Sequence, residues 1–385
     1  MKKYSSTFSQ MLQLIPRYEF QKAVSAYAAE RHSKGFSSWE QFVAMLFAQF
    51  SGQDGLRGIE TGIASQAKHL YHLGVKSVKR STLAYANSHR NSDVFKSVFE
   101  TMLGVVSKEA PRHKFRFKND LYSIDATTVD LCLSLYDWAK FRTTKGGIKV
   151  HVKLNHSGYI PEFVTVTEAK RHEVKELPKL RLKSGDVVAF DRGYADFKRF
   201  AKYCEEGIYF VTRLKKNADY KIVDRNDVST YKNISSDQII EMNGFYTKQK
   251  CPMRLRRIRV KDPETKKYIV ILTNQMDWAP TTVASVYKDR WQIEIFFKMM
   301  KQNLKITSFL GTTRNAMISQ IWIAMIAYLL LAYLKFKSTY EWTVNSLMKV
   351  LPTVLFSRRD LMEWLHHPFG VPDENVTKDL QLQLL

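Results

Sequence analysis

Residues 121–131 read LYSIDATTVDL, and the chain changes there from helical to strand character. The next segment, GIKVHVKLN (147–155), alternates apolar residues with Lys149, His151 and Lys153, which predicts a half-exposed strand. A turn at 156–158 (HSG) and renewed β character after it predict a hairpin.

Two further strands are expected at VVAF (187–190) and GIYFVTRLK (207–215), with a helix over 194–205 between them. A polar helical stretch is expected near 169–180. This order of strands and helices predicts an α/β fold layered around a mixed sheet.

Two aspartates follow or interrupt these apolar runs. Asp125 lies inside the first run, and Asp191 follows VVAF, with Gly193 permitting a tight exit turn. Ligands of α/β sheets gather outside the carboxyl ends of strands, so both carboxylates could face a crevice. For either aspartate taken alone, an aspartate that only caps the next turn or helix is the more common explanation.

The charge balance indicates the class of binding partner. The chain has 60 Lys+Arg against 37 Asp+Glu, a formal net charge of +23, and 45% hydrophobic residues. That hydrophobic content excludes a wholly disordered chain. A surface this basic favours a polyanion, with nucleic acid first and an anionic membrane surface second. No basic amphipathic helix with a clean apolar face supports the membrane alternative.

Cysteines and apolar runs bear on the compartment. Cys132, Cys204 and Cys251 are far apart and lack metal-ligand spacing, which favours a reducing cytosol. The first 16 residues lack the apolar core of a signal peptide. The longest apolar run, 321–334, is 14 residues, short of the roughly 18 that a membrane span needs. We therefore expect a buried core helix and a cytoplasmic protein with no membrane partner.

Residues before 115 have helical periodicity. Helices are expected over 18–31 and 38–50, with Ser38 as a possible N-cap. A basic turn, VKSVKRST (75–82), precedes a possible N-cap at Ser81. Such a turn suits phosphate contact or a helix-turn-helix, and a solvated connector between core helices is the alternative.

Residues 216–280 have β character broken by polar loops, with a turn at Pro263-Glu264, which indicates an insertion into the core or an extension of it. Pro280 opens a predicted helix through about Gln302, and 305–385 is mostly helical.

One stripe of the predicted 280–302 helix is polar. Tyr287, Arg290, Glu294, Lys298 and Lys301 fall within an arc of about 80° at 100° per residue. A solvated polar face is one explanation. A single acid among three cations, with a tyrosine beside them, instead suits metal and phosphate chemistry.

These residues resemble a known family. Y-(2)-R-(3)-E-(6)-K, formed by Tyr287, Arg290, Glu294 and Lys301, is similar to the signature of the DDE transposases of bacterial insertion sequences in family four. Asp125 in SIDATT and Asp191 in VVAFDRGY resemble the two catalytic aspartates. The resemblance covers about 120–310, and the N-terminal helices resemble the segment that precedes the core in a subgroup of the family.

The resemblance implies a ribonuclease H-like core in which Asp125, Asp191 and Glu294 are catalytic and ligate two Mg²⁺ ions, with Mn²⁺ as a substitute. Oxygen ligands suit Mg²⁺ and Mn²⁺. A pair of such ions neutralises charge on the attacking and leaving oxygens of a phosphodiester. It also implies that Tyr287, Arg290 and Lys301 grip the DNA end. We assign Lys298, one turn past Glu294, and Arg192 to the same DNA.

In this family, ends are released through a DNA hairpin, and a flipped base stacks on an aromatic of the insertion. Tyr246 and Trp278 are candidates, and a core position is the alternative for both. His151 and His172 are expected at the surface. The following basic residues are expected to follow the DNA backbone: Lys140, Arg142, Lys145, Arg254, Arg256, Arg257 and Arg259.

The expected domains are a helical, DNA-binding segment 1–115, a ribonuclease H-like core 116–310 with a β-rich insertion at about 216–280, and a helical region 311–385. The expected function is a cut-and-paste DNA transposase acting on its own terminal inverted repeats and on target DNA. It would work as a homodimer and associate with the nucleoid. A ribonuclease H-like nuclease without strand transfer, and a catalytically silent DNA-binding regulator, are the alternatives.

Overall fold

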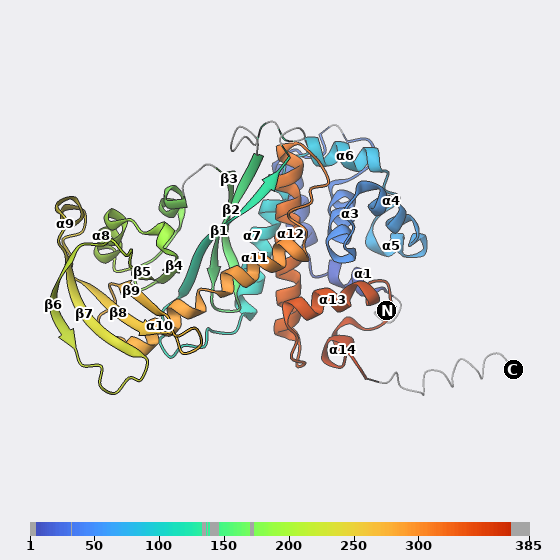
Figure 1. The fold of residues 1–385 in the computed structure, drawn as a ribbon. Helices are drawn as coiled ribbons and strands as arrows, with labels where there is room; N and C mark the ends of the chain where they lie inside the picture. Colours follow the sequence, from blue (N-terminus) through green and yellow to red (C-terminus); the bar gives the residue numbers. More distant parts are fainter. Residues whose placement is uncertain are drawn as a thin grey trace. The chain divides into compact units, whose positions relative to one another are not determined.

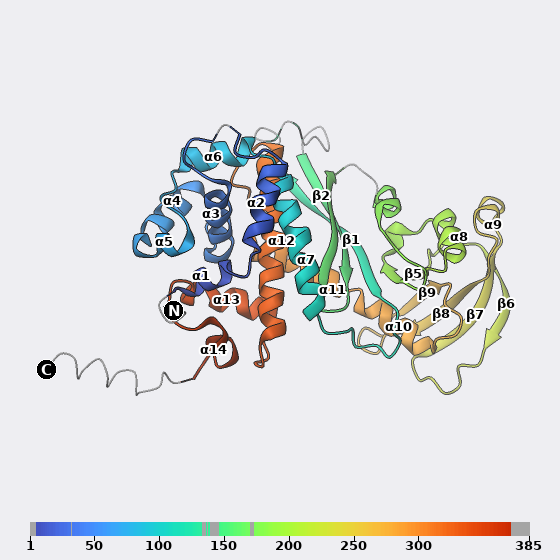
Figure 2. The ribbon, with the colours of Figure 1, turned by 180° about the vertical axis from the view of Figure 1, so that it is seen from behind.

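The computed structural model describes residues 5–31, 33–132, 136, 138, 146–169 and 173–370. The chain forms two compact units. One unit is Ala110–Gln302, the green to yellow and orange part of Figure 1. The other combines Met1–Glu109 with Asn303–Leu385, so its helices come from both ends of the chain, in blue and red in Figures 1 and 2.

A mixed sheet forms the centre of the 110–302 unit. Within the described residues it has nine strands in the order β3-β2-β1-β4-β5-β9-β8-β7-β6. The strands are β1 Leu121–Leu131, β2 Gly146–Asn155, β3 Ile160–Glu168, β4 Val187–Phe190, β5 Tyr209–Arg213, β6 Tyr220–Asn226, β7 Ile234–Met242, β8 Leu255–Lys261 and β9 Tyr268–Thr273. β4 runs parallel to both β1 and β5, and the other pairs are antiparallel. The predicted mixed α/β architecture is confirmed.

The hairpin of β2 and β3 forms at the predicted turn, where Gly158 takes a positive φ of 70° that glycine adopts without strain. The prediction of a half-exposed β2 is wrong, because β2 lies between β1 and β3 and is largely buried. Lys153 is kept there by an ion pair with Glu162 (Nζ–Oε2, 3.0 Å) and by the ring of Tyr122, 4.1 Å from its Nζ.

Helices cover both faces of the sheet. On one face, Tyr122, Ile124, Val188 and Phe190 pack with residues of α8 (Phe197–Glu205). On the other, Leu121, Val187, Ala189 and Val211 pack with residues of α10 (Pro280–Asp289). Side chains of a strand alternate between faces, so every second residue of β1 and β4 points to the α10 side.

Residues 216–280 extend this sheet, because β9 pairs with β5 and β8, β7 and β6 follow in order. Arg256 of β8 is buried, which corrects its expected place on the DNA backbone. Its guanidinium makes two hydrogen bonds to Asp237, of 2.9 and 2.6 Å, and donates to the carbonyls of Gln275, Met276 and Trp278. The insertion is thereby fastened to the loop that leads into α10.

The remaining elements of this unit are short: the 3₁₀ helices η4 (Glu173–Lys179) and η5 (Arg192–Tyr194), and the helix α9 (Phe245–Lys250). The 3₁₀ helix η4 falls in the stretch where a polar helix was expected.

The second unit is helical. Its helices are α1 Thr7–Leu12, α2 Arg17–Ala26, α3 Ser38–Ser51, α4 Leu56–Ala64, η2 Ala67–His69, α5 Leu70–Leu73, α6 Arg80–His89, α7 Asp93–Glu109, α12 Arg314–Lys337, α13 Val344–Val354 and α14 Leu361–His366. α12 packs against α3, α6 and α7. It is long and apolar enough to cross a membrane, but 89% of its apolar window is buried, as predicted for a core helix.

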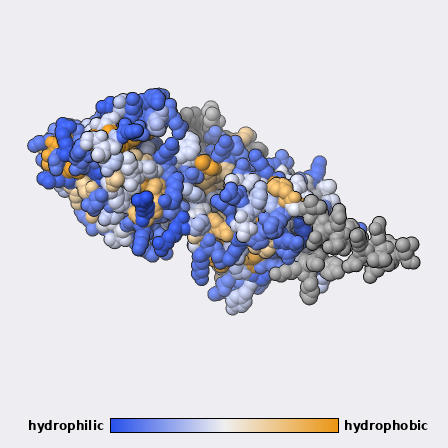
Figure 3. All heavy atoms as spheres, turned by 90° about the horizontal axis from the view of Figure 1, so that it is seen from below, coloured by the Kyte–Doolittle hydropathy of each residue, from blue (hydrophilic) through white to orange (hydrophobic). Residues whose placement is uncertain are grey.

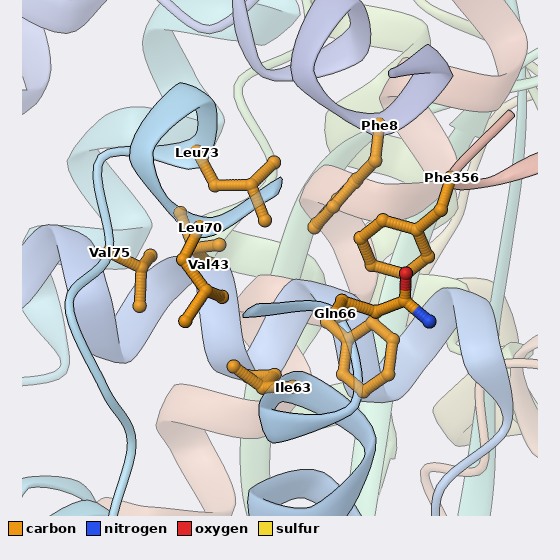
Figure 4. Close-up of a pocket in the computed structure, with 9 residues that line it drawn as sticks. Phe8, Val43, Ile63, Gln66, Leu70, Leu73, Val75 and Phe356 are labelled. Carbon is orange, nitrogen blue, oxygen red and sulfur yellow. The ribbon is translucent and has the colours of Figure 1, made fainter. Parts of the chain in front are cut away.

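Two expected N-caps of this unit are corrected. Ser37, not Ser38, caps α3, in a capping box with Glu40 that satisfies backbone N–H groups at the helix start. α6 begins one residue before Ser81, at Arg80. Figure 4 shows how apolar side chains of α1, α3, α4 and α5, with Phe356, meet around a small pocket beside α3.

Hydrophilic residues cover most of the face drawn in Figure 3. Such a surface fits the net charge of +23.

Candidate active site

Asp125 lies on β1, and Asp191 directly follows β4, the parallel strand next to it. Ile124 of β1 pairs with Phe190 of β4, so the two aspartates occupy the next position along each strand. Leu121 and Val187, four residues earlier, both belong to the cluster on the α10 side. The alternation of strand side chains therefore directs both carboxylates toward α10.

The helix after Pro280 is interrupted, contrary to the prediction of one continuous helix to Gln302. α10 ends at Asp289 and α11 spans Gln292–Gln302. Around Trp291 the backbone forms tighter i→i−3 hydrogen bonds, including Trp291 N–H to the Lys288 carbonyl at 3.2 Å. The break falls between Tyr287 and Glu294, and Arg290 lies in it.

Arg290 joins two of the predicted catalytic residues. Its Nη2 donates to Oε1 of Glu294 at 2.7 Å, and its Nη1 lies 3.8 Å from Oδ2 of Asp125. The Arg290 side chain is only 11% exposed. Burial is the largest single influence on the pKa of Arg290 and would lower it, but the hydrogen bond to Glu294 and the electrostatic influence of Tyr287, Glu294 and Asp125 together outweigh burial and raise that pKa, so the guanidinium remains a permanent cation.

Tyr287 adds a connection to the second aspartate. Burial raises the pKa of Tyr287, and the negative charge of Asp191 raises it further, while Arg290 and Arg213 oppose the shift. The ring of Tyr287 also lies 5.7 Å from the Arg290 guanidinium carbon. Tyr287 is therefore a neutral hydroxyl within the electrostatic reach of both Asp191 and Arg290.

The other predicted site residues differ in exposure. Lys298 is exposed on α11, and Arg192 is exposed at the start of η5. Lys301 instead donates from Nζ to the backbone carbonyl of Thr128, at 2.9 Å, and so ties α11 to β1. The structure therefore leaves Lys298 and Arg192 at the surface and engages Lys301 within the protein.

A hollow of about 490 Å³ lies beside Asp191. Its lining residues are Asp191, Arg192, Gly193, Lys215, Lys216 and Asn217. The two lysines follow β5, which is parallel to β4, so the loops after both strands meet at one sheet edge. Sequence reasoning missed Lys215 and Lys216, although their place at the end of a predicted strand, 207–215, was the signal that could have found them.

The carboxylates offer only oxygen donors, which suit Mg²⁺ or Mn²⁺. Within the described ranges, no three His, Cys, Asp or Glu side chains come close enough to form a preformed metal site. Asp125 and Glu294 do share one cation, the guanidinium of Arg290. Their chemistry thus fits a divalent cation, and Asp191 lies one strand away from Asp125.

Several further expectations concern residues away from the carboxylates. The rings of Trp278 and Phe117 stack with their centroids 4.0 Å apart, so Trp278 has a packing role. Tyr246 is instead exposed and lies beside Phe245. His151 is buried and hydrogen-bonded to Thr167 at 2.9 Å, so its expected surface position is wrong. Lys140, Arg142, Lys145 and His172 lie outside the described residues.

Comparison with known sequences gives two matches to protein families. The transposase DDE domain matches residues 116–330, a stretch that includes all the residues of the candidate site. A domain of unknown function, DUF4372, matches residues 3–76.

Individual relatives agree with the first match. A protein of Sinorhizobium fredii named as a transposase is 31% identical over 285 residues, which cover 72% of this chain and 78% of the relative. A Geobacillus stearothermophilus protein named as an insertion-sequence transposase is 26% identical over 363 residues, covering 93% and 91%. Among solved structures, a piggyBac transposase synaptic complex with hairpin DNA aligns over 97% of this chain and 83% of that one, with 10% identity and a TM-score of 0.44.

Proposed function

This chain belongs to the transposases with a DDE catalytic domain, and we propose that it cuts and joins the terminal inverted repeats of its own insertion sequence. The observation that supports this most is the position of Arg290, whose guanidinium contacts both Asp125 and Glu294. Asp125 and Glu294 are 169 residues apart in sequence, and Asp191 directly follows β4, the strand next to that of Asp125.

We assign a ribonuclease H-like core to the sheet β3-β2-β1-β4-β5, with β6–β9 as the insertion. Support comes from the strand order. β3, β2 and β1 are antiparallel neighbours, β4 then runs parallel to β1, and β5 runs parallel to β4. One acid within β1, a second directly after the neighbouring β4 and a third on a helix packed beside β1 are the arrangement this function needs. Membership of insertion-sequence family four remains part of this proposal.

Asp125, Asp191 and Glu294 would hold the divalent cations. When bound, such cations supply charge neutralisation at the attacking and leaving oxygens of the phosphodiester, together with an activated nucleophile. Arg290 keeps Asp125 and Glu294 near each other through its own positive charge and prevents their mutual repulsion from separating the strand and the helix. Tyr287 is a neutral hydroxyl, and the rise of its pKa only strengthens that state. It can donate a hydrogen bond to a phosphate oxygen near Asp191.

The DNA end would lie along the basic side chains that surround these carboxylates. Exposed Lys298 on α11 and exposed Arg192 beside Asp191 are available to phosphate oxygens. Lys215 and Lys216 extend this positive surface around the hollow at Asp191. We propose that Lys301 both attaches α11 to β1 and contacts DNA. Its ammonium donates one hydrogen bond to the Thr128 carbonyl and has two further N–H donors for phosphate oxygens.

A hairpin at the DNA end needs an aromatic surface for an unstacked base. Tyr246 fits this need better than Trp278, because Tyr246 is 74% exposed whereas Trp278 is stacked on Phe117. Lys248 and Lys250 follow on the same short helix and could hold neighbouring phosphates.

The helical unit is a second DNA-binding candidate. Residues 56–90 contain six Lys or Arg and one acid, Glu60. Within this stretch, α6 packs through Leu83, Ala86 and Asn87 and leaves Arg80 and Tyr85 exposed. A basic helix with an exposed aromatic, preceded by Lys76 and Lys79, fits a duplex that carries the terminal repeat.

A cleavage and strand-transfer assay on a terminal-repeat duplex tests the proposal. The chain should cut the duplex in Mg²⁺ and join the released end to a target plasmid, and an end with a sealed hairpin should appear before joining. Cutting without joined products would favour the ribonuclease H-like nuclease. Binding without cutting would favour the silent regulator. A particle containing two chains and two ends, measured by light scattering, would support a homodimer.

A further inference from the structure

A network centred on buried Asp289 and His156 lies directly next to the candidate site. The carboxylate of Asp289, the last residue of α10, pairs through Oδ1 with Nζ of Lys114 at 2.5 Å and through Oδ2 with Nδ1 of His156 at 2.7 Å. The hydroxyl of Tyr159 also reaches Oδ2, at 3.3 Å. On its other side, Nε2 of His156 lies 2.6 Å from the hydroxyl of Ser123.

A neutral His156 satisfies both of its contacts, with Nδ1–H donating to Asp289 and Nε2 accepting from Ser123. Burial lowers the pKa of His156, which favours this neutral form. The hydrogen bonds from His156 and Lys114 lower the pKa of Asp289 in spite of its burial, so Asp289 is the charged member.

The serine, histidine and aspartate have the connectivity of a hydrolase triad, but they cannot act as one. The side chain of His156 is 0% exposed, and Ser123 is likewise 0% exposed. A nucleophile must reach its substrate, and this hydroxyl is enclosed. The network is therefore a link between elements of the protein.

The linked elements are those that hold the carboxylates. Ser123 lies on β1 two residues before Asp125, hence on the same face of the strand, and Asp289 immediately precedes Arg290. His156 comes from the turn between β2 and β3. The network thus joins β1, this turn and the α10–α11 junction one step away from the contacts of Arg290 with Asp125 and Glu294.

We propose that Asp289 is a positioning residue, which, through His156 and Ser123, holds the α10–α11 junction against β1 so that Arg290 and Glu294 stay at Asp125. A buried carboxylate is tolerated only where its partners satisfy it, so Asp289 permits one placement of the helix end. This inference rests on the proposed transposase function for its catalytic consequence, and its structural part stands on the network itself.

The test compares Asp289→Asn with Glu264→Gln. The second variant is a matched control, because Glu264 pairs with Lys288 of the same helix α10 in an exposed ion pair whose side chains are 78% and 76% exposed. For Asp289→Asn we expect the single-turnover cleavage rate of a terminal-repeat duplex to fall by about tenfold or more. The Kd for that duplex should change little. Glu264→Gln should match the unchanged chain in both the cleavage rate and the Kd.

Hydrogen exchange separates this inference from the proposed function. Amides of residues 290–296 should exchange faster in Asp289→Asn than in the unchanged chain, whether or not the protein cleaves DNA, while other amides of the sheet keep their rates. If the unchanged chain cuts no DNA but this exchange difference is present, the proposed function fails and the structural link stands.

Ser123→Ala is a second variant in case Asp289→Asn does not fold. It removes the attachment to β1 and leaves Asp289 paired with His156 and Lys114. Slower cleavage with unchanged DNA binding would support the inference. Folded Asp289→Asn or Ser123→Ala proteins that cleave at the full rate, with unchanged exchange at 290–296, would overturn it, as would equal losses in binding and cleavage.

Discussion

Asp289 and Arg290 are adjacent in the chain, yet their side chains belong to two different sets of contacts. Asp289 pairs with Lys114 and His156, whereas Arg290 contacts Glu294 and Asp125. In the first set Asp289 and His156 are buried and Lys114 reaches the surface, and the second set is where we propose that DNA is cut. The short break between α10 and α11 allows consecutive residues to serve both.

Replacing any one of Asp125, Asp191 or Glu294 by Ala should reduce Mg²⁺-dependent cleavage by more than about 100-fold, because even residues that only orient metal ligands typically cost 10–100-fold. Binding of the terminal-repeat duplex should persist, since its affinity comes mainly from phosphate contacts. Gel-based cleavage and mobility-shift assays measure the two. A variant that cleaves at the full rate would remove that residue from the proposed site.

Arg290→Lys should lower the cleavage rate by roughly 10–100-fold. Lysine keeps the charge but is a point donor, which cannot bridge two carboxylates as a planar guanidinium does. Arg181→Lys, at an exposed position, is the control. Full activity of Arg290→Lys would mean that charge alone, and not the bridge from Asp125 to Glu294, is what the site requires.

Arg256→Ala should lower the free energy of unfolding by about 3–5 kcal/mol, because it leaves Asp237 charged and buried without its partner. Arg254→Ala breaks the ion pair with Glu241, whose side chains are 64% and 35% exposed, and should cost no more than about 1 kcal/mol. Urea denaturation followed by circular dichroism gives both values. Equal costs would contradict the buried position of Arg256.

The stability of the 110–302 unit should fall as the pH decreases below about 6.5, the ordinary pKa of histidine. Burial lowers the pKa of His156, so the unfolded chain takes up a proton in this range that the folded chain refuses. Each pH unit can then cost up to about 1.4 kcal/mol. Urea denaturation between pH 7 and pH 5 should show a shallower pH dependence for His156→Gln than for the unchanged chain.

Lys215→Gln with Lys216→Gln should weaken binding of the terminal-repeat duplex and reduce its salt dependence. The slope of log affinity against log salt should become shallower by about 0.9 for each DNA phosphate that the variant no longer neutralises. Lys22→Gln, at an exposed lysine paired with Glu19, is the control. An unchanged slope would show that the hollow beside Asp191 does not hold a DNA backbone.

Local patterns in the sequence predicted the strands around Asp125 and Asp191, and the parallel pairing of β1 with β4 explains why both acids lie side by side. The break at Arg290 was not predictable from periodicity, because the apolar residues of α10 and α11 follow one helical repeat. Arg290 and Asp125 are 165 positions apart in sequence, so their convergence depends on how the whole unit folds.

Burial of charged residues was the other point that periodicity could not predict. Lys153 and Arg256 have the sequence context of exposed strand residues, yet both are buried with acidic partners. Whether a strand is central or at an edge decides this, and strand order is a property of the whole sheet. The Asp289 network was missed for the same reason, since its five side chains come from segments that meet only in the folded sheet.

The helical unit includes α3, α6 and α7 from the start of the chain and α12 from beyond residue 313. A ribosome synthesises roughly 200 residues between α7 and α12, which takes roughly 10–40 s at 5–20 residues per second. During that interval the early helices lack the apolar partner that completes their core and are open to chaperones, while the sheet of the 110–302 segment can already assemble. Nascent chains should therefore acquire a folded catalytic segment before a folded helical one.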